Sequence, residues 1–129
     1  MDGRHRISSA MPWEGSIGYS RAVVVGDHVF VSGTAPVMPD GADPPSDPHG
    51  QARRCLEIVL AALAEAGARP EDVVRTRMYL TRAGDIDEVG RAHAEVFGNV
   101  RPATTGVVVA ALLDERWLVE IEADAIIAR

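Results

Sequence analysis

The sequence has 129 residues, of which 47% are hydrophobic and 25% charged, proportions typical of one soluble domain spanning residues 1–129. Its 13 basic residues, all arginine, stand against 19 acidic ones, and the net charge of −6 disfavours nucleic acid as a partner. The lone Cys55 excludes an internal disulfide and no apolar run approaches the ~20 residues of a membrane helix, so we expect a protein of the reducing cytoplasm with no membrane partner.

The first predicted elements form a hairpin. Valine-rich runs flank Gly26-Asp27, a pair typical of tight turns, so strands are expected over 21–26 and 28–34. A stretch rich in Pro, Gly and Asp follows over 36–48 and is interpreted as one surface loop.

A helix is predicted after this loop. Asp47 and Pro48 have the residue types preferred at the N-cap and at the first helical position. Gly67 is expected to end the helix, as glycine commonly does. Its apolar stripe at helical spacing consists of Ala52, Cys55, Leu56, Val59, Leu60, Leu63 and Ala66.

The next two elements are a strand and a second helix. Residues 73–80 alternate, so Val74, Thr76, Met78 and Leu80 are expected on one face and Arg75, Arg77 and Tyr79 on the other. Asp85 and Glu88 resemble a capping box at a helix start, and Gly98-Asn99 ends the pattern. The apolar stripe of this helix is Ile86, Val89, His93, Val96 and Phe97.

Two further strands complete the prediction, over 104–111 and 118–127, with a turn at 114–116. In the last strand apolar residues at 119, 121, 123, 125 and 127 alternate with Glu120, Glu122 and Asp124.

The order of elements, β-β-α-β-α-β-β, predicts an α+β fold with both helices on one face of a mixed sheet. The opposite face would carry the charged residues of the last strand together with Arg75, Arg77, Phe30, Tyr79, Leu118 and Ile126. Such a partly apolar face favours burial against another subunit over exposure to water. The alternative is a solvated face.

Several short strings, in their order and spacing, resemble the Rid family, also called YjgF or reactive-intermediate deaminases. These strings lie between about residues 15 and 125: Gly18-Tyr19-Ser20, Val31-Ser32-Gly33-Thr34-Ala35-Pro36, Gln51-Ala52-Arg53, Pro102-Ala103 and Val119-Glu120-Ile121-Glu122-Ala123. The resemblance implies a chorismate-mutase-like α+β fold and a homotrimer with clefts between subunits. It also implies hydrolysis of small enamines and imines to 2-oxo acids and ammonia, without a metal or organic cofactor.

The resemblance also implies the site. A carboxylate is needed to position or deprotonate the attacking water, and this role falls to Glu120. Tyr19 corresponds to the aromatic lid, and Ser32 and Gly33 to a wall of backbone groups. Ser32 is not expected to be a nucleophile, because no base is readable near it in the sequence.

One element of the family pattern is absent. Deaminase-type members have a carboxylate-binding Arg after the Pro-Ala pair, and Thr104 stands there in this chain. Gly106 replaces a cysteine of the same strand, and Gly90 lies near an asparagine of many members. Thr104 and Gly106 are therefore expected to line an altered binding site. Arg77 is the candidate replacement cation, although its alternative role is an ion pair with Glu122 or Asp124.

The remaining polar residues support no metal site. The four histidines come from different elements without ligand spacing, and one cysteine cannot form a multi-thiolate centre. We interpret His93 as a partly buried structural histidine and Cys55 as an inert core thiol.

Three functions stay open from the sequence. The first is an enzyme, a hydrolase of imines or enamines with an altered substrate range. The second is a trimeric protein that binds a small molecule such as an imine, enamine or oxo acid without catalysis. The third, an endoribonuclease or translation inhibitor, is an older label of the family that the net charge of −6 disfavours.

Overall fold

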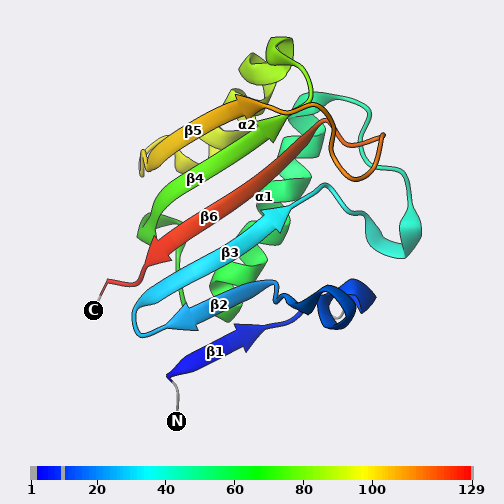
Figure 1. Ribbon diagram of the computed structural model, residues 1–129. Coiled ribbons are helices and arrows are strands. Elements are labelled where there is room, and N and C mark those ends of the chain that lie inside the picture. The colour runs from blue at the N-terminus through cyan, green and yellow to red at the C-terminus, as the bar shows by residue number, and fades with distance from the viewer. Residues whose placement is uncertain (1–2, 10, 129) are drawn as a thin grey trace.

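The computed structural model describes residues 3–9 and 11–128. Six strands form one mixed sheet, and two long helices pack against one face of it (Figure 1). The strands are β1 (Arg4–Ile7), β2 (Ala22–Val25), β3 (His28–Thr34), β4 (Val73–Leu80), β5 (Ala103–Val108) and β6 (Val119–Ile126). The two long helices are α1 (Pro48–Glu65) and α2 (Ile86–Phe97). The connections contain four short helical segments, the π-helix η1 (Glu14–Gly18) and the 3-10 helices η2 (Pro39–Gly41), η3 (Pro70–Asp72) and η4 (Ala83–Asp85).

The sheet has the order β1-β2-β3-β6-β4-β5. Among the described strands, β4 and β5 are parallel and the other neighbouring pairs are antiparallel. The predicted α+β class, with both helices on one face of a mixed sheet, is confirmed (Figure 1). Strand β1, at the edge of the sheet beyond β2, has no counterpart among the predicted elements.

The core lies between the sheet and the two helices. The predicted alternation of β6 is confirmed: Val119, Ile121, Ala123 and Ala125 are at most 1% exposed, whereas the acidic residues between them lie on the other face. On the helix side the largest fully buried side chains include Leu56, Val59 and Leu63 of α1 and Val89 and Phe97 of α2. Asp47 caps α1 as predicted, accepting a hydrogen bond from the Gly50 amide.

Three local predictions were wrong. Val74 is 43% exposed instead of facing the core, because the β4–β6 register shifts between Val73 and Arg75 and places Val73 inward. Asp85 does precede α2, but its carboxylate makes no capping bond and pairs with Arg82 instead. Ile86, at the start of the predicted stripe, is 42% exposed.

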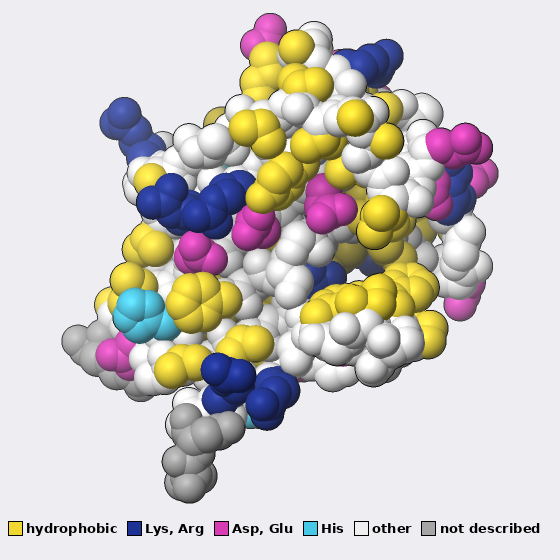
Figure 2. Space-filling view, viewed as in Figure 1, with side chains coloured by type: hydrophobic (Ala, Val, Ile, Leu, Met, Phe, Trp, Pro, Cys, Tyr) yellow, Lys and Arg dark blue, Asp and Glu magenta, His cyan; other side chains and the backbone are white. Residues whose placement is uncertain are grey.

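The face of the sheet without helices is open in the single chain. Figure 2 shows this face, on which acidic, basic and apolar side chains lie side by side. Phe30 and Ile126 are 46% and 43% exposed on it, as the sequence pattern predicted. In the described part of the chain, no helix has the length and apolar character needed to cross a bilayer.

Candidate functional site

Glu120 lies on the open face, near the beginning of β6, and is half-buried. Its carboxylate accepts no hydrogen bond from any described residue. Burial raises the pKa of this carboxyl above its ordinary value, the positive charge of Arg21 opposes this rise, and the negative charge of Glu122 adds to it. An unpaired carboxylate that holds its proton more tightly than usual is suited to accept a proton from water.

Gly33 makes room for this carboxylate. The β3–β6 register shifts between Val31 and Thr34, so the strand bulges at Ser32-Gly33. A β-carbon at Gly33 would overlap Oε2 of Glu120. Glycine at residue 33 therefore leaves the Glu120 carboxylate in its place beside β3, and a larger residue would make the end of that side chain shift.

Ser32 is occupied by a structural contact. Its hydroxyl donates a 2.6 Å hydrogen bond to the carbonyl oxygen of Ser20, which ties β3 to the segment entering β2. The Ser32 amide donates a 3.0 Å hydrogen bond to the carbonyl oxygen of Arg21, so the hydroxyl and the amide are both used within the chain. Its carbonyl accepts hydrogen bonds from Arg21 and from the hydroxyl of Thr34.

Arg21 is the residue of this region that the sequence analysis did not single out. Its Nη2 atom donates to Ser32 O at 2.7 Å, Gly33 O at 2.9 Å and Thr34 Oγ1 at 2.7 Å. Burial lowers the pKa of its guanidinium, and Tyr19, Glu14 and Glu120 are among the groups that oppose this shift. The sequence feature that could have indicated Arg21 is that it is a single charged residue directly before an apolar strand.

Tyr19 and Glu14 lie on the η1 side of Arg21. Tyr19 ends η1, and its amide donates a 3.0 Å hydrogen bond to the carbonyl oxygen of Glu14. The Glu14 carboxylate accepts hydrogen bonds from Ser8 and from the amide and hydroxyl of Ser9. The Ser9 hydroxyl is the main reason that the pKa of Glu14 lies below its ordinary value. Tyr19, Ser32, Gly33 and Glu120 are thus arranged around Arg21.

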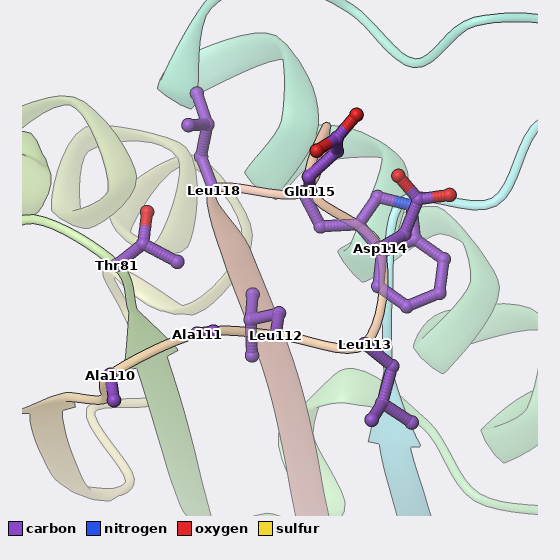
Figure 3. Close-up of a pocket in the computed structure, with 9 residues that line it drawn as sticks. Thr81, Ala110, Ala111, Leu112, Leu113, Asp114, Glu115 and Leu118 are labelled. Carbon is purple, nitrogen blue, oxygen red and sulfur yellow. The ribbon is translucent and has the colours of Figure 1, made fainter.

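The open face is hollowed beside η1, and arginine side chains are visible at the bottom of the hollow (Figure 2). An open cavity of about 600 Å³ lies near the beginning of β6, and the loop that joins β5 to β6 forms most of its lining (Figure 3). It is lined by Thr81, residues 110–115, Trp117 and Leu118. The predicted site residues are not among its lining residues, but Leu118 lies two positions before Glu120.

Gln51 fixes the loop that leads to Glu120. This side chain is 1% exposed, and its Nε2 donates to the carbonyl oxygens of Pro45 and Arg116, both at 2.9 Å. Its Oε1 accepts a 2.7 Å bond from the Leu118 amide. The N-terminal part of α1 therefore positions the start of β6.

Thr104 and Gly106 lie apart from Glu120 within the chain. The Thr104 hydroxyl is 2.9 Å from that of Thr76, which is fully buried and 2.8 Å from Nε2 of His93 on α2. A β-carbon at Gly106 would contact side chains of Ile86, Leu80 and Met78. Both positions face the helices, whereas Glu120, paired with Tyr79, faces the open side. His93 is partly buried and hydrogen-bonded, as interpreted from the sequence.

Arg77 forms the ion pairs that were its alternative role. Its Nη1 lies 3.5 Å from Oε2 of Glu122 and 3.7 Å from Oδ2 of Asp124. Glu122 also accepts a hydrogen bond from the hydroxyl of Tyr79. Arg77 is on the same face as Glu120, but its charge is shared by two carboxylates. Over the described residues, no three His, Cys, Asp or Glu side chains form a group that would hold a metal ion.

Comparisons with known proteins agree with this fold. Residues 11–127 match the family described as endoribonuclease L-PSP. The protein SCO2049 of Streptomyces coelicolor is 43% identical over 120 residues, which cover 93% of this chain and 90% of that protein. The "Putative reactive intermediate deaminase TdcF" of Escherichia coli is 32% identical over 115 residues, covering 87% and 89% of the two chains.

Two solved structures have the same fold as this chain. Rv2704 of Mycobacterium tuberculosis, a member of the YjgF/YER057c/UK114 family, superposes with a TM-score of 0.88 at 44% identity and covers 96% of this chain and 99% of its own. Escherichia coli TdcF, crystallised with bound serine, has a TM-score of 0.80 at 28% identity, covering 95% and 94% of the two chains.

Proposed function

Because this chain belongs to the endoribonuclease L-PSP family, which includes the YjgF and Rid proteins, we propose that it hydrolyses small imines or enamines to a carbonyl compound and ammonia. The relatives that carry a deaminase name support this reaction class, and serine bound to TdcF supports a small amino-acid-like ligand. The net charge of −6 argues against RNA as the substrate.

The observation that carries the proposal is the unpaired, half-buried carboxylate of Glu120 beside the bulge at Gly33. In the proposed reaction Glu120 takes a proton from a water molecule whose oxygen attacks the imine carbon. The carbon–nitrogen double bond becomes a single bond and the nitrogen takes up a proton. The resulting carbinolamine expels ammonia and leaves a carbonyl group, so one water is consumed for each ammonia released. An enamine must first isomerise to its imine.

The proposed site lies between subunits of a homotrimer. Exposed apolar side chains on the open face, Phe30 and Ile126 among them, support burial of this face against another copy. The edge strand β5 is exposed along its whole length, including Val107 at 42% and Val108 at 54%. Light scattering is expected to give three times the 13.8 kDa mass of the chain. A single-chain mass at micromolar concentration would contradict the trimer.

Thr104 lies where deaminase-type relatives would have a charged side chain, and this difference affects the expected substrate range. Its hydroxyl is bonded to Thr76, and threonine has no charge with which to hold a substrate carboxylate. We propose that the range differs from that of deaminases with Arg at this position. The same observation favours a second candidate function, a trimer that binds a small molecule without turning it over. A saturable ligand-induced rise in melting temperature without turnover would support that alternative.

The test is ammonia release from enzymatically generated 2-aminoacrylate and from imines that lack a carboxylate. Glu120→Gln should abolish any acceleration, because an amide cannot take the proton. Asp124→Asn is the matched control: it makes the same kind of change on the same strand and face, and turnover should persist. A folded trimer that accelerates none of these reactions would refute the hydrolase.

A further inference from the structure

We infer that Arg21 binds the anionic end of the small ligand that occupies the site at Glu120. This inference depends on the proposed function for its ligand class, a small imino or oxo acid. Arg21 belongs to the same chain as Glu120 and lies next to the bulge that accommodates the Glu120 carboxylate.

The guanidinium of Arg21 has donor capacity to spare. All three of its hydrogen bonds use Nη2, which is held by the carbonyls of Ser32 and Gly33 and by the hydroxyl of Thr34. Nε is enclosed and has no acceptor among the described residues. Nη1 is not enclosed in this way and donates to none of them either. Arginine has five N–H donors, and a guanidinium fixed on one side presents the others in a defined direction.

Arg21 and Glu120 influence each other without touching. Each charge shifts the pKa of the other group in the direction that favours ionisation. Yet no nitrogen of Arg21 lies within 4.0 Å of a Glu120 oxygen, the limit for an ion pair. The two groups are therefore close enough for their charges to interact, yet they are not joined as an ion pair, and Gly33 contacts both of them. In the inferred complex Arg21 binds the negative end of the ligand, and Glu120 takes a proton from the attacking water.

The competing cation on this face is already neutralised. Arg77 is flanked by Glu122 and Asp124, within 3.5 and 3.7 Å. Arg21 has no carboxylate within ion-pair distance among the described residues. Of its acidic neighbours, Glu14 is engaged by Ser8 and Ser9, and Glu120 is separated from it. A partly buried cation without a close counter-charge is costly, and an anionic ligand would relieve that cost.

The experiment measures binding of pyruvate, a small 2-oxo acid, by calorimetry. Arg21→Gln is expected to weaken pyruvate binding about tenfold or more, because one charge-assisted hydrogen bond and its charge are lost. Arg91→Gln is the matched control. It removes one positive charge from the exposed surface of α2, and affinity should stay unchanged. Pyruvamide, which lacks the negative charge, should bind the unchanged protein more weakly than pyruvate.

A second measurement covers the case in which Arg21→Gln does not fold. The arginine Nε–H signals of the unsubstituted protein are followed by NMR during the pyruvate titration, with the Arg21 signal assigned from its loss in Arg21→Lys. A shift with pyruvate but not with pyruvamide is expected. An unmoved Arg21 signal, unchanged affinity in folded Arg21→Gln, or loss of binding only in Arg77→Gln would each overturn the inference.

Failure of the inference and failure of the hydrolase are distinguishable. Ammonia release from 2-aminoacrylate that survives Arg21→Gln with unchanged KM would overturn the role of Arg21 and leave the hydrolase standing. Pyruvate binding that depends on Arg21 in a protein without imine hydrolysis would support the anion site and refute the enzyme. Absence of saturable pyruvate binding in the unsubstituted protein would overturn the inference.

Discussion

The Glu120 carboxylate occupies the space that a side chain on residue 33 would need, since a β-carbon at Gly33 would overlap Oε2 of Glu120. The backbone torsion of Gly33 is not in the left-handed region, so glycine provides space at this position and is not needed for the backbone conformation. The identity of residue 33 and the position of the candidate catalytic group are thereby coupled.

Gly33→Ala should displace the Glu120 carboxylate. We expect roughly tenfold to hundredfold slower turnover, because small misplacements of a catalytic group are costly. The protein should still fold, since the carboxylate is at the end of a rotatable side chain on the open face. Steady-state kinetics with circular dichroism checks both expectations. Full activity in Gly33→Ala would show that the position of this carboxylate is unimportant.

Gly90→Ala is the complementary change. Gly90 lies inside α2, and a β-carbon there would meet nothing within 4 Å. Alanine should therefore stabilise the protein by about 0.5–1 kcal/mol, as alanine does relative to glycine within helices. Urea denaturation measures this difference, and turnover should be unaffected. A loss of stability would mean that α2 contacts another surface at this position.

The pH dependence of turnover should reflect the raised pKa of Glu120. The reaction needs the ionised carboxylate, so the rate should fall as pH drops through a value above that of an ordinary glutamate. Stability should change in the opposite direction. The folded chain takes up this proton at higher pH than the unfolded chain, so the contribution of Glu120 to stability increases as pH falls through the raised pKa. Glu120→Gln should be more stable than the parent at neutral pH, measured by denaturant titration.

His93 should make the protein less stable in mild acid. Burial lowers the pKa of this imidazole below 6.5, so the unfolded chain binds the proton more readily than the folded one. Its stabilising contribution is present above pH 6.5 and is lost as pH falls from there through the lowered pKa. His93→Gln should flatten the stability profile over this interval, when unfolding free energies at pH 5 and pH 7 are compared. A slope identical to that of the parent would assign the acid sensitivity to other groups.

Thr76→Val tests the hydrogen bonds that join Thr104 to His93. The hydroxyl of Thr76 is within 2.9 Å of both partners and is fully buried. Valine keeps the shape but leaves the imidazole without that bond, which should cost about 1–3 kcal/mol of unfolding free energy. Thermal or urea denaturation measures the loss. Thr105→Val, on the exposed edge strand, is the control and should cost little.

Periodicity was sufficient for the main elements, since both helices, both strands of the hairpin and the alternation of β6 follow from residue spacing. It failed where pairing between strands decided the outcome. Val74 fits the alternation of β4, but the register shift between Val73 and Arg75 leaves it 43% exposed and puts Val73 in the core. Asp85 and Glu88 have capping-box spacing, yet the Asp85 carboxylate binds Arg82 instead. Such competition between partners leaves no trace in a one-dimensional pattern.

The site was predictable only where the family resemblance supplied the residues. Gly33 and Glu120, which lie against each other, were both named from it. Arg21 was not predicted as a site residue, because its surroundings come from residues far away in the sequence. These are hydrogen-bond acceptors on β3 and the carboxylate of Glu120 on β6. Thr104 was expected beside the ligand, and within the chain its hydroxyl is hydrogen-bonded to that of Thr76. The catalytic role of Glu120 stays a prediction, as do the binding roles of the other named residues, Tyr19, Ser32, Gly33, Thr104, Gly106 and Arg77.

The short strand β1 has a practical consequence for anyone who shortens this chain. It lies before the segment 11–127 that matches the family, yet it pairs with β2 over four residues and buries Ile7 to 3% exposure. A protein shortened to residues 11–127 would lack β1, so the backbone amides and carbonyls of β2 that pair with β1 would be exposed at the edge of the sheet. An unpaired edge strand of this kind can pair with strands of other chains. We therefore expect the shortened protein to aggregate under conditions in which the full chain does not.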